Sequence, residues 1–560
     1  MTAPPGRGGP IFPSPNPQPT VPRPWWQTGV VYHVYPRSFG DTTGNGVGDL
    51  DGIAAHLDHV AWLGADAVWI GPFYPSPQAD FGYDVADHCD VDPLFGDLAA
   101  FDRLVAAAHD RGLRVIVDWI PNHTSDRHPW FAESRAGRGS PKRGWYVWRD
   151  PKPDGSPPNN WLSAFGGPAW TLDERTGRYY LHSFLPQQPD VDWRHPALRA
   201  AMLDVLRFWL DRGVDGFRVD VANHVLKDPA LRDNPPHPAP SGGHKPTAPY
   251  DRQRHVHDRD QPGAVDLYRE VRALVDGYGE RVLIGETFLA HDLGAWASYF
   301  GDEGGPQTGG AALHLPQNFG LLETEWTAPA LRAHVEAVEA AVPEWGWPSY
   351  VLGSHDERRL AGRLGEARAR QAAVLLLTLR GTPTLYYGDE IGTPDVDVPP
   401  DRVRDPAALR TGIAGLGRDA GRTPMAWDGT PSAGFSAAPP GALWLPLHDG
   451  HDVLNVEAET RDPGSFLHLY RRLLALRRAR PALHAGSFRA LDGVPADVFA
   501  WERRSGDDRT RTYLNVGGAG REVEVGPWRR AVSTHDAAPV EAGGAVALRP
   551  WEGAVFLPAA

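Results

Sequence analysis

An arginine and an aspartate interrupt an apolar run in the stretch GVDGFRVDVANHV, where they could do chemistry. Arg218 and Asp220 alternate there with Phe217, Val219 and Val221. Alternate residues of a strand share a face, so the two charged side chains lie together, opposite the apolar ones. Burying a charge is costly unless it is paired. The pattern indicates either a structural ion pair or a carboxylate that a neighbouring guanidinium keeps ionised.

More polar side chains stand at the ends of this and other β-rich runs of the chain. They are Asp118, Asn122, His123, Asn223, His224, Glu286, His355, Asp356, Glu357, Asp389 and Glu390. Several carboxylates at one site repel one another unless the site uses them. Carboxylates and neutral polar groups without a Cys/His cluster fit glycoside hydrolysis, which needs one ionised and one protonated carboxyl group.

The two carboxyl roles can be assigned as a hypothesis. Arg218 would lower the pKa of Asp220, which makes Asp220 the nucleophile. Glu286 has no basic neighbour in sequence, and nearby anions would raise its pKa, as an acid requires. If the two carboxyl groups are about 5–5.5 Å apart, the mechanism is retaining.

A barrel of parallel strands would bring these positions together. Eight apolar β-rich runs occupy residues 29–39, 66–74, 113–121, 215–221, 281–287, 311–319, 349–357 and 382–390. Helix-like segments stand between them, at 97–112, 195–213, 264–279 and 367–381. This alternation predicts an α/β fold, a (β/α)8 TIM barrel with its active site at the carboxyl ends of the strands. A doubly wound sheet is the alternative, but it rarely needs eight near-equivalent units.

The domain organisation follows from changes in composition. Residues 1–23 are rich in Pro and Gly and predict a disordered tail. Residues 24–486 form the catalytic barrel, and 122–192 an inserted subdomain after the third strand. The long segment 222–262 is typical of a lid or binding loop. Alternating short runs predict a C-terminal antiparallel β-domain over 487–560.

Composition excludes several classes of function. The net charge of −14 argues against nucleic acid or an anionic membrane as partner. The single cysteine, Cys89, allows no internal disulfide or cysteine-based metal cluster. Neither a signal peptide nor a run of about 18 apolar residues is present. We therefore expect a cytoplasmic monomer or homodimer whose partner is a small molecule and which needs no organic cofactor.

The motifs together resemble glycoside hydrolase family 13, the α-amylase superfamily, and most closely its α-glucosidase and oligo-1,6-glucosidase members. The matching stretches are VDWIPNHTS, QPDVDW, GFRVDVANH, IGET, LGSHDE, GTPTLYYGDEIG and RDAGRTPMAWD, in the family's order over about residues 25–485. Ser354 and Asp192 depart from the residues usual there, and neither departure removes a catalytic group. The valine after Asp220 tends to accompany α-1,6 activity in the resembling glucosidases.

The resemblance implies a set of site residues. Asp220 would be the nucleophile, Glu286 the acid/base and Asp356 the transition-state stabiliser. The side chains implied to hold the terminal glucose are His123, Arg218, His355, the stacking Tyr83, the clamping pair Asp80 and Arg422, and the wall residue Phe165. For Tyr83 and Phe165 ordinary packing is the alternative.

A loop near the amino end could hold a structural cation. In DTTGNGVGD, the residues Asp41, Thr43, Asn45, Val47 (through its carbonyl) and Asp49 have the alternate spacing of a calcium loop, with Gly46 at the turn. The resembling glucosidases often bind Ca²⁺ or Mg²⁺ at this place. Only two carboxylates are present, so a plain Gly/Asn turn is the alternative.

The function expected from the resemblance is a retaining, exo-acting α-glucosidase that cleaves terminal α-glucosyl residues of short oligosaccharides or disaccharides through a covalent glucosyl-Asp intermediate. A transglucosylase or sugar isomerase would share that intermediate and differ in whether water or a sugar intercepts it. A non-catalytic relative, such as the amylase-like part of transporter heavy chains, is disfavoured because all three carboxylates are present. An endo-acting amylase is disfavoured if the clamping pair closes the pocket.

Overall fold

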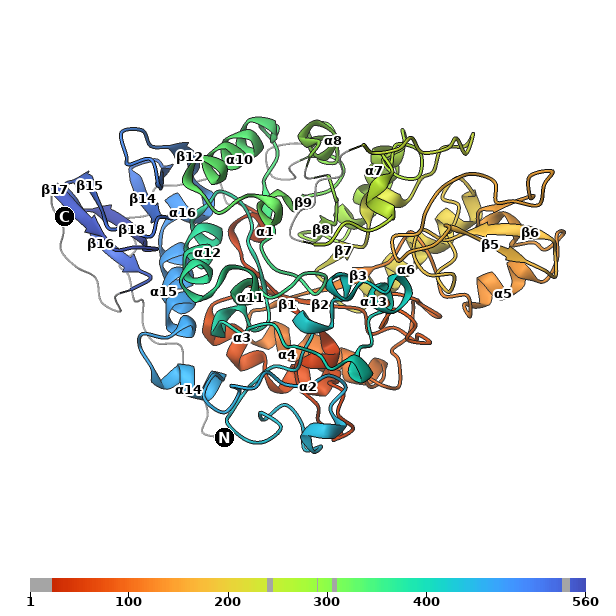
Figure 1. Cartoon of the computed structure of the whole chain (residues 1–560), viewed down its shortest axis with the longest axis horizontal. Helices are drawn as coiled ribbons and strands as arrows, with labels where there is room; N and C mark the ends of the chain where they lie inside the picture. Colours follow the sequence, from red (N-terminus) through yellow and green to blue (C-terminus); the bar gives the residue numbers. More distant parts are fainter. Residues whose placement is uncertain (1–22, 239–244, 290, 305–309, 536–543, 560) are drawn as a thin grey trace.

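Eight parallel strands surround the centre of the molecule in the computed structural model, which describes residues 23–238, 245–289, 291–304, 310–535 and 544–559 (Figure 1). These strands are β1 (Val31–Val34), β2 (Ala67–Ile70), β3 (Arg114–Trp119), β7 (Gly216–Val219), β8 (Val282–Gly285), β9 (Leu315–Asn318), β10 (Ser349–Tyr350) and β11 (Thr384–Tyr386). They pair in the order β10-β9-β8-β7-β3-β2-β1-β11, which nearly closes a barrel. Each lies within one of the runs predicted from sequence, so the TIM barrel is confirmed.

Helices cover the outside of this barrel. The longer ones are α4 (Leu98–Asp110), α6 (Pro196–Asp211), α7 (Ala264–Asp276), α10 (Ala328–Ala341), α12 (Glu366–Thr378) and α15 (Phe466–Ala479). Shorter helices stand elsewhere along the chain, some of them outside the barrel, as α5 does in the inserted segment. They are α1 (Trp25–Thr28), α2 (Leu50–Ala55), α3 (Leu57–Leu63), α5 (Pro129–Arg135), α8 (Leu293–Ser298), α9 (Gly320–Glu323), α11 (Leu360–Leu364), α13 (Pro406–Thr411), α14 (Val456–Arg461) and α16 (Pro481–Ala485). None of the helices in the described ranges has the length and apolar character needed to cross a membrane.

The alternation of side chains along each strand divides the apolar core in two. Phe217 and Val219 of β7 pack outward into the large cluster shared with the helices. Ile116 of β3 and Ile284 of β8 belong to a separate cluster with Trp69 of β2. Arg218 lies between the two outward residues and therefore points into the barrel, where Trp69 lies 5.2 Å from its guanidinium carbon. The strand period thus sends the charged face of β7 to the barrel interior.

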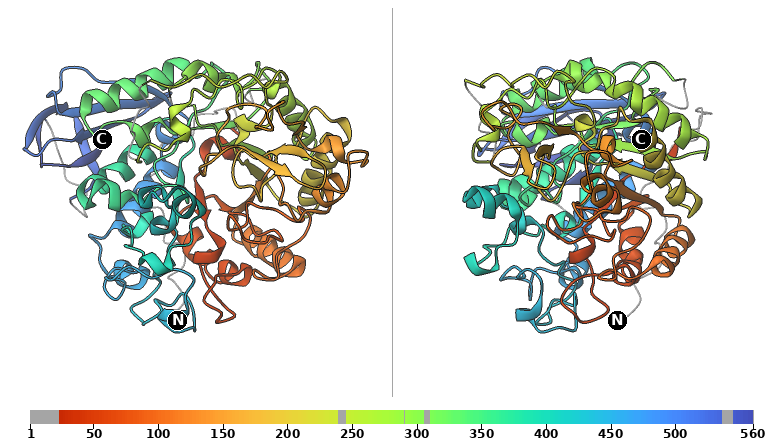
Figure 2. Two further views of the ribbon diagram at one scale, coloured as in Figure 1. Left: turned by 45° about the vertical axis from the view of Figure 1, so that its right-hand side comes forward. Right: turned by 90° about the vertical axis from the view of Figure 1, so that its right-hand side faces the viewer.

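Two smaller sheet regions flank the barrel on opposite sides (Figure 2). Strands β4 (Trp148–Arg149), β5 (Trp170–Asp173) and β6 (Arg178–Leu181) pair antiparallel within the segment inserted after β3. The carboxyl end of the chain holds β12 (Ser487–Ala490), β13 (Val498–Ser505), β14 (Asp508–Asn515), β15 (Arg521–Gly526), β16 (Trp528–Ser533), β17 (Gly544–Leu548) and β18 (Gly553–Pro558). The predicted inserted and C-terminal antiparallel sheets are therefore present, whereas the tail over residues 1–22 lies outside the described residues.

Candidate active site

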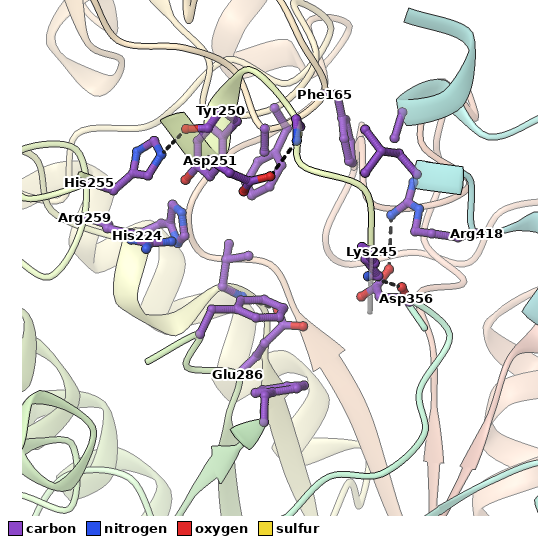
Figure 3. Close-up of a pocket in the computed structure, with 18 of the residues that line it drawn as sticks. Phe165, His224, Lys245, Tyr250, Asp251, His255, Arg259, Glu286, Asp356 and Arg418 are labelled. Atoms are coloured by element: carbon purple, nitrogen blue, oxygen red, sulfur yellow. Dashed lines mark hydrogen bonds and ion pairs between the residues drawn. The ribbon is translucent and has the colours of Figure 1, made fainter. Parts of the chain in front are cut away.

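A cavity of about 470 Å³ opens at the carboxyl ends of the barrel strands (Figure 3). Its lining includes the predicted residues Asp80, Tyr83, His123, Phe165, Asp220, Glu286 and Asp356. Sites for small molecules have volumes of about 300–1,000 Å³. The fold therefore brings three carboxylates from β7, β8 and the end of β10 to one hollow, as the barrel hypothesis requires.

Arg218 connects the carboxylates at the floor of this cavity. Its Nη1 lies 3.0 Å from Asp118 Oδ1 and 2.8 Å from Asp220 Oδ1, and its Nη2 forms an ion pair with Glu286 Oε1. The register explains these contacts, because Asp118 of β3 lies directly beside Arg218 of β7. Asp220 and Glu286 thus share one guanidinium, so they lie close together and not on opposite rims. Glu286 has a basic neighbour after all, which its flanking sequence did not reveal.

The backbone conformation of the residue that follows Asp220 fixes the position of the Glu286 carboxylate. Val221 has φ 37° and ψ 51°, a left-handed conformation that is strained for a β-branched residue. In this conformation its N–H donates to Glu286 Oε2 at 2.9 Å. Val221 therefore does not continue the apolar face of the strand, as its place in the sequence suggested, but turns the chain and lines the cavity.

Burial dominates the protonation of the Asp220–Glu286 pair. It raises the pKa of Glu286 to about 7, although the Arg218 guanidinium acts in the opposite direction. Burial also raises the pKa of Asp220, again against Arg218, and the Glu286 carboxylate adds to the increase. The expectation that Arg218 leaves Asp220 with a lowered pKa is therefore wrong for the free site, because desolvation outweighs one shared guanidinium. Two carboxyl groups this close titrate as a pair, which can hold one proton between them.

Asp356 has the opposite electrostatic environment. Burial disfavours its charge, but the guanidinium groups of Arg418 and Arg422 hold the pKa of Asp356 well below its usual range. Its Oδ1 accepts hydrogen bonds from Arg418 at 3.1 Å and from Arg422 at 2.9 Å. The cavity therefore contains one permanent carboxylate beside a pair that shares a proton. That combination can stabilise a positive charge that develops at the anomeric carbon of a sugar.

Two aromatic rings stack on His355. The Tyr83 ring lies at a centroid distance of 5.3 Å from the imidazole, and the Tyr35 ring at 5.7 Å. The Tyr83 hydroxyl lies 2.6 Å from His355 Nε2 and donates to Asp118 Oδ2 at 3.2 Å. Burial lowers the pKa of His355 well below the ordinary value, so the imidazole is neutral. Tyr83 and His355 thus form a rigid, uncharged part of the site.

In the structure, the arginine that contacts Asp80 is Arg418 and not the predicted Arg422. Asp80 Oδ1 accepts from Arg418 Nη2 at 2.7 Å, and Asp80 Oδ2 accepts from Gln188 at 3.1 Å. Phe165 lies 4.9 Å from the Arg418 guanidinium carbon. Asp80, Arg418 and Phe165 therefore close one end of the cavity, where Figure 3 shows Phe165 and Arg418 together.

The prediction that Arg422 forms the clamp with Asp80 is therefore wrong. It is fully buried and lies below the cavity, where its Nε donates to the His355 carbonyl at 2.7 Å and its Nη2 reaches Asp356. The short helix Asp419–Gly421 separates the two arginines of RDAGRTPMAWD, and both guanidinium groups donate to Asp356 Oδ1. Sequence spacing could not tell which of them reaches Asp80.

The segment after β7 supplies lining residues that the sequence did not single out. It contributes Lys245, Tyr250, Asp251, His255 and Arg259. Lys245 Nζ donates to the Asp356 carbonyl and to Glu357 Oε1, both at 2.8 Å. Figure 3 shows Tyr250, His255 and Arg259 on the side of the cavity away from Phe165 and Arg418. The length of this segment signalled a binding loop, but its spacing identified none of these side chains.

An apolar wall faces this segment. Phe288 and Phe319 stack at a centroid distance of 4.7 Å and line the cavity with Leu322 of α9. Not every polar strand end reaches the cavity, however. Glu390, after β11, accepts from the Tyr32 hydroxyl at 2.6 Å and lies 3.0 Å from His59 Nε2, which makes it a structural contact.

The candidate cation loop is held by its own hydrogen bonds in this conformation. Asp41 accepts from the backbone N–H groups of Thr43, Gly44 and Gly46 at 2.8–3.0 Å. Asn45 Oδ1 accepts from the Val47 N–H at 2.7 Å. Asp49 accepts from Gly52 at the start of α2. Across the described ranges, no group of three or more His, Cys, Asp or Glu side chains could hold a metal ion. This loop has only two carboxylates, and a cation here stays a prediction.

A family model described as "Alpha amylase, catalytic domain" matches residues 33–486, which include the barrel from the second half of β1 onward and all residues that line the cavity. The chain belongs to the α-amylase family. Within this family it is 42% identical over 505 residues to a probable alpha-glucosidase of Rhizobium meliloti (strain 1021), covering 88% of this chain and 90% of that protein. It is 33% identical over 580 residues to an oligo-1,6-glucosidase of Parageobacillus thermoglucosidasius, covering 95% and 99%.

Solved structures of family members superpose over nearly the whole chain. An alpha-glucosyl transfer enzyme matches with a TM-score of 0.89 and 39% identity, covering 96% of this chain and 100% of that one. The trehalulose synthase of Pseudomonas mesoacidophila MX-45 matches with a TM-score of 0.84 and 33% identity, with the same coverage. The predicted family and enzyme class are confirmed: the chain is a family 13 glycoside hydrolase of α-glucosidase type.

Proposed function

We propose that this α-amylase family member is a retaining, exo-acting α-glucosidase that hydrolyses terminal α-glucosyl residues of short oligosaccharides or disaccharides. The observation that carries the proposal is the shared contact of Asp220 and Glu286 with Arg218. Two carboxyl groups on one guanidinium can flank a single glycosidic bond, as a retaining mechanism needs. Relatives named alpha-glucosidase and oligo-1,6-glucosidase support the substrate class.

The reaction would proceed in two displacements. Asp220 attacks the anomeric carbon as the glycosidic bond breaks, and Glu286 gives its proton to the departing oxygen. Water then attacks the anomeric carbon and gives one proton to Glu286 as the bond between the glucosyl unit and Asp220 breaks. This step restores the Asp220 carboxylate and the Glu286 carboxylic acid. A Glu286 pKa of about 7 suits a group that first donates and then accepts a proton. Asp356, held ionised by its arginines, stabilises the oxocarbenium-like charge between the steps.

Closure of the cavity at one end supports exo action. The Asp80–Arg418 ion pair and the Phe165 ring stand where a longer chain would have to continue beyond the terminal glucosyl unit. Both ion-pair partners are almost fully buried, and their hydrogen-bonding groups match the hydroxyls of one terminal sugar. An endo-acting enzyme would need this end open.

A transglucosylase or sugar isomerase is the second candidate, favoured by the similarity to an alpha-glucosyl transfer enzyme and a trehalulose synthase. The polar segment after β7 and the apolar Phe288–Phe319 wall could hold a sugar acceptor between them. If an acceptor intercepts the intermediate, the products are new disaccharides; if water does, they are free glucose.

Turnover of nitrophenyl α-glucoside, isomaltose, maltose, sucrose and trehalose, with the product anomer followed by NMR, tests these assignments. We expect α-glucose as the first product, and its ratio to new disaccharides separates the two candidates. Asp220→Asn should lower turnover by at least about 10⁴-fold without loss of fold, whereas Asp507→Asn at an exposed position should leave it unchanged. Initial release of β-glucose, or wild-type activity of the Asp220 variant, would overturn the proposal.

A further inference from the structure

A buried lysine joins three parts of the chain next to the cavity. Lys227 follows β7 and is 5% exposed. Its Nζ donates to Asn122 Oδ1 at the end of β3 at 3.0 Å and to the His224 carbonyl at 2.5 Å. It also lies 3.0 Å from Asp190 Oδ2, near the end of the inserted segment. All three N–H groups of the ammonium therefore have a partner, and Lys227 is not among the residues that line the cavity.

Asp190 is a buried carboxylate whose charge is balanced by this ammonium. It is 1% exposed and accepts hydrogen bonds from the Ser183 N–H at 2.9 Å and from the Ser183 hydroxyl at 2.5 Å. Among the ion pairs of the described residues, its partner is Lys227. Breaking a buried pair by removing one member leaves an uncompensated charge, which is strongly unfavourable.

His123 lies directly beside this ion pair. Its backbone forms a bridge with Asp190, and its Nδ1 lies 3.2 Å from Asn122 Nδ2. The orientation of Asn122 is fixed, because its Oδ1 accepts from Lys227 and its Nδ2 donates to Asp190 at 3.2 Å. The lysine, the aspartate and the asparagine thus determine the surroundings of an imidazole that lines the cavity.

The charges around His123 oppose one another. Burial lowers the pKa of His123 to about 4; the Asp190 carboxylate acts to raise it, and the Lys227 ammonium to lower it. The other titratable groups that face His123 are His88, whose pKa burial lowers to about 4, and His224, whose pKa burial lowers well below the ordinary value. Both are neutral, so the charged groups that shift the pKa of His123 are the Asp190 carboxylate and the Lys227 ammonium, and their effects oppose each other.

We propose that Lys227 is a positioning residue for the glycoside hydrolase reaction. It neutralises Asp190 and fixes Asn122, and it thereby keeps His123 uncharged and oriented in the wall of the pocket. The inference rests on the proposed function, because His123 matters only if a glucosyl unit occupies that pocket. A lysine that merely joined the inserted segment to the barrel would affect stability alone.

The test is the pH dependence of kcat/KM for nitrophenyl α-glucoside. Lys227→Met keeps the length and apolar stem of the side chain and removes its charge. Asp190 then raises the pKa of His123 toward the ordinary value of about 6.5, so the acid limb of the profile should move up by about one pH unit or more. Activity near pH 5.5 should fall roughly tenfold more than activity near pH 7.5. Lys227→Arg retains the charge and should keep the wild-type acid limb.

A second change separates the electrostatic role from a structural one. Adding Asp190→Asn to Lys227→Met removes the uncompensated anion and should return the acid limb to its wild-type position. Asp190→Asn alone should move the acid limb to lower pH, which tests the inference even if Lys227→Met does not fold. Lys142→Met, at an ion pair with Glu133 on the inserted segment, is the matched control and should leave the profile unchanged.

The possible outcomes are distinguishable. If Lys227→Met lost activity equally at every pH, or if Asp190→Asn did not move the acid limb, Lys227 would have a structural role only and the inference would be wrong. A wild-type protein that releases no glucose from α-glucosides would instead refute the proposed function.

Discussion

Replacing Arg418 by methionine tests which arginine clamps the terminal sugar. The guanidinium contacts the carboxylates of Asp80 at 2.7 Å, Asp356 at 3.1 Å and Asp405 at 2.5 Å. Its side chain is 10% exposed, and those of Asp80 and Asp405 are 5% and 0% exposed. Arg418→Met therefore leaves carboxylates buried without this partner, although Asp356 keeps its contact with Arg422.

The magnitude follows from the cost of an unpaired buried charge. Removing one member of a buried pair costs about 3–5 kcal/mol. Each 1.4 kcal/mol is about a factor of ten, so the loss corresponds to roughly two to three and a half powers of ten. Because part of this free energy is lost from the stability of the free enzyme, we expect the lower end of the range. The kcat/KM for maltose should fall by at least about 100-fold. Most of the change should be in KM, because Asp80 lines the cavity and is the proposed contact of the terminal sugar.

The assay compares two arginines of one motif. Steady-state kinetics of Arg418→Met and Arg422→Met are measured on maltose and nitrophenyl α-glucoside, with unfolding temperatures recorded. Arg422→Met should act mainly on kcat, because Arg422 supports Asp356 and His355 from below. Arg404→Met, at an exposed position of the same loop, should change neither constant. A KM for Arg418→Met within about twofold of wild type, or a larger KM effect in Arg422→Met, would refute the reasoning.

Two further predictions concern protonation and the amino-terminal loop. Because burial raises the pKa of Glu286 to about 7, the proton that Asp220 and Glu286 share is lost above that pH, so kcat/KM should decline above about pH 7. A decline that persists unchanged in Glu286→Gln, measured on an activated substrate that needs no acid, would assign that limb to another group. If Ca²⁺ or Mg²⁺ occupies the loop of Asp41 and Asp49, chelation should lower the unfolding temperature by a few degrees and leave kcat unchanged once the temperature is low enough for folding. If the chelator did not change the unfolding temperature and elemental analysis found no metal, the loop would be a hydrogen-bonded turn without a cation.

The sequence by itself determined the barrel and the carboxylates that converge on its cavity. Each parallel strand is buried on both sides and reads as a compact apolar run, and parallel strands place their carboxyl ends at one mouth. Asp220, Glu286 and Asp356 therefore had to converge once the eight runs were identified. The period of two along β7 likewise required Arg218 to point into the barrel.

Only the tertiary structure decided which groups meet across that mouth. The sequence holds Arg418 and Arg422 in the same short motif, and only the fold sends Arg418 to Asp80 and Arg422 to the His355 carbonyl. The direction of the Asp220 pKa depends on desolvation, which is set by the whole surrounding fold and not by the adjacent residue. Lys227 and Asp190 stand 37 positions apart, and their pairing arises because the inserted segment returns to the end of β3. Local periodicity specifies strands and faces, whereas charge, burial and long-range partners are properties of the packed chain.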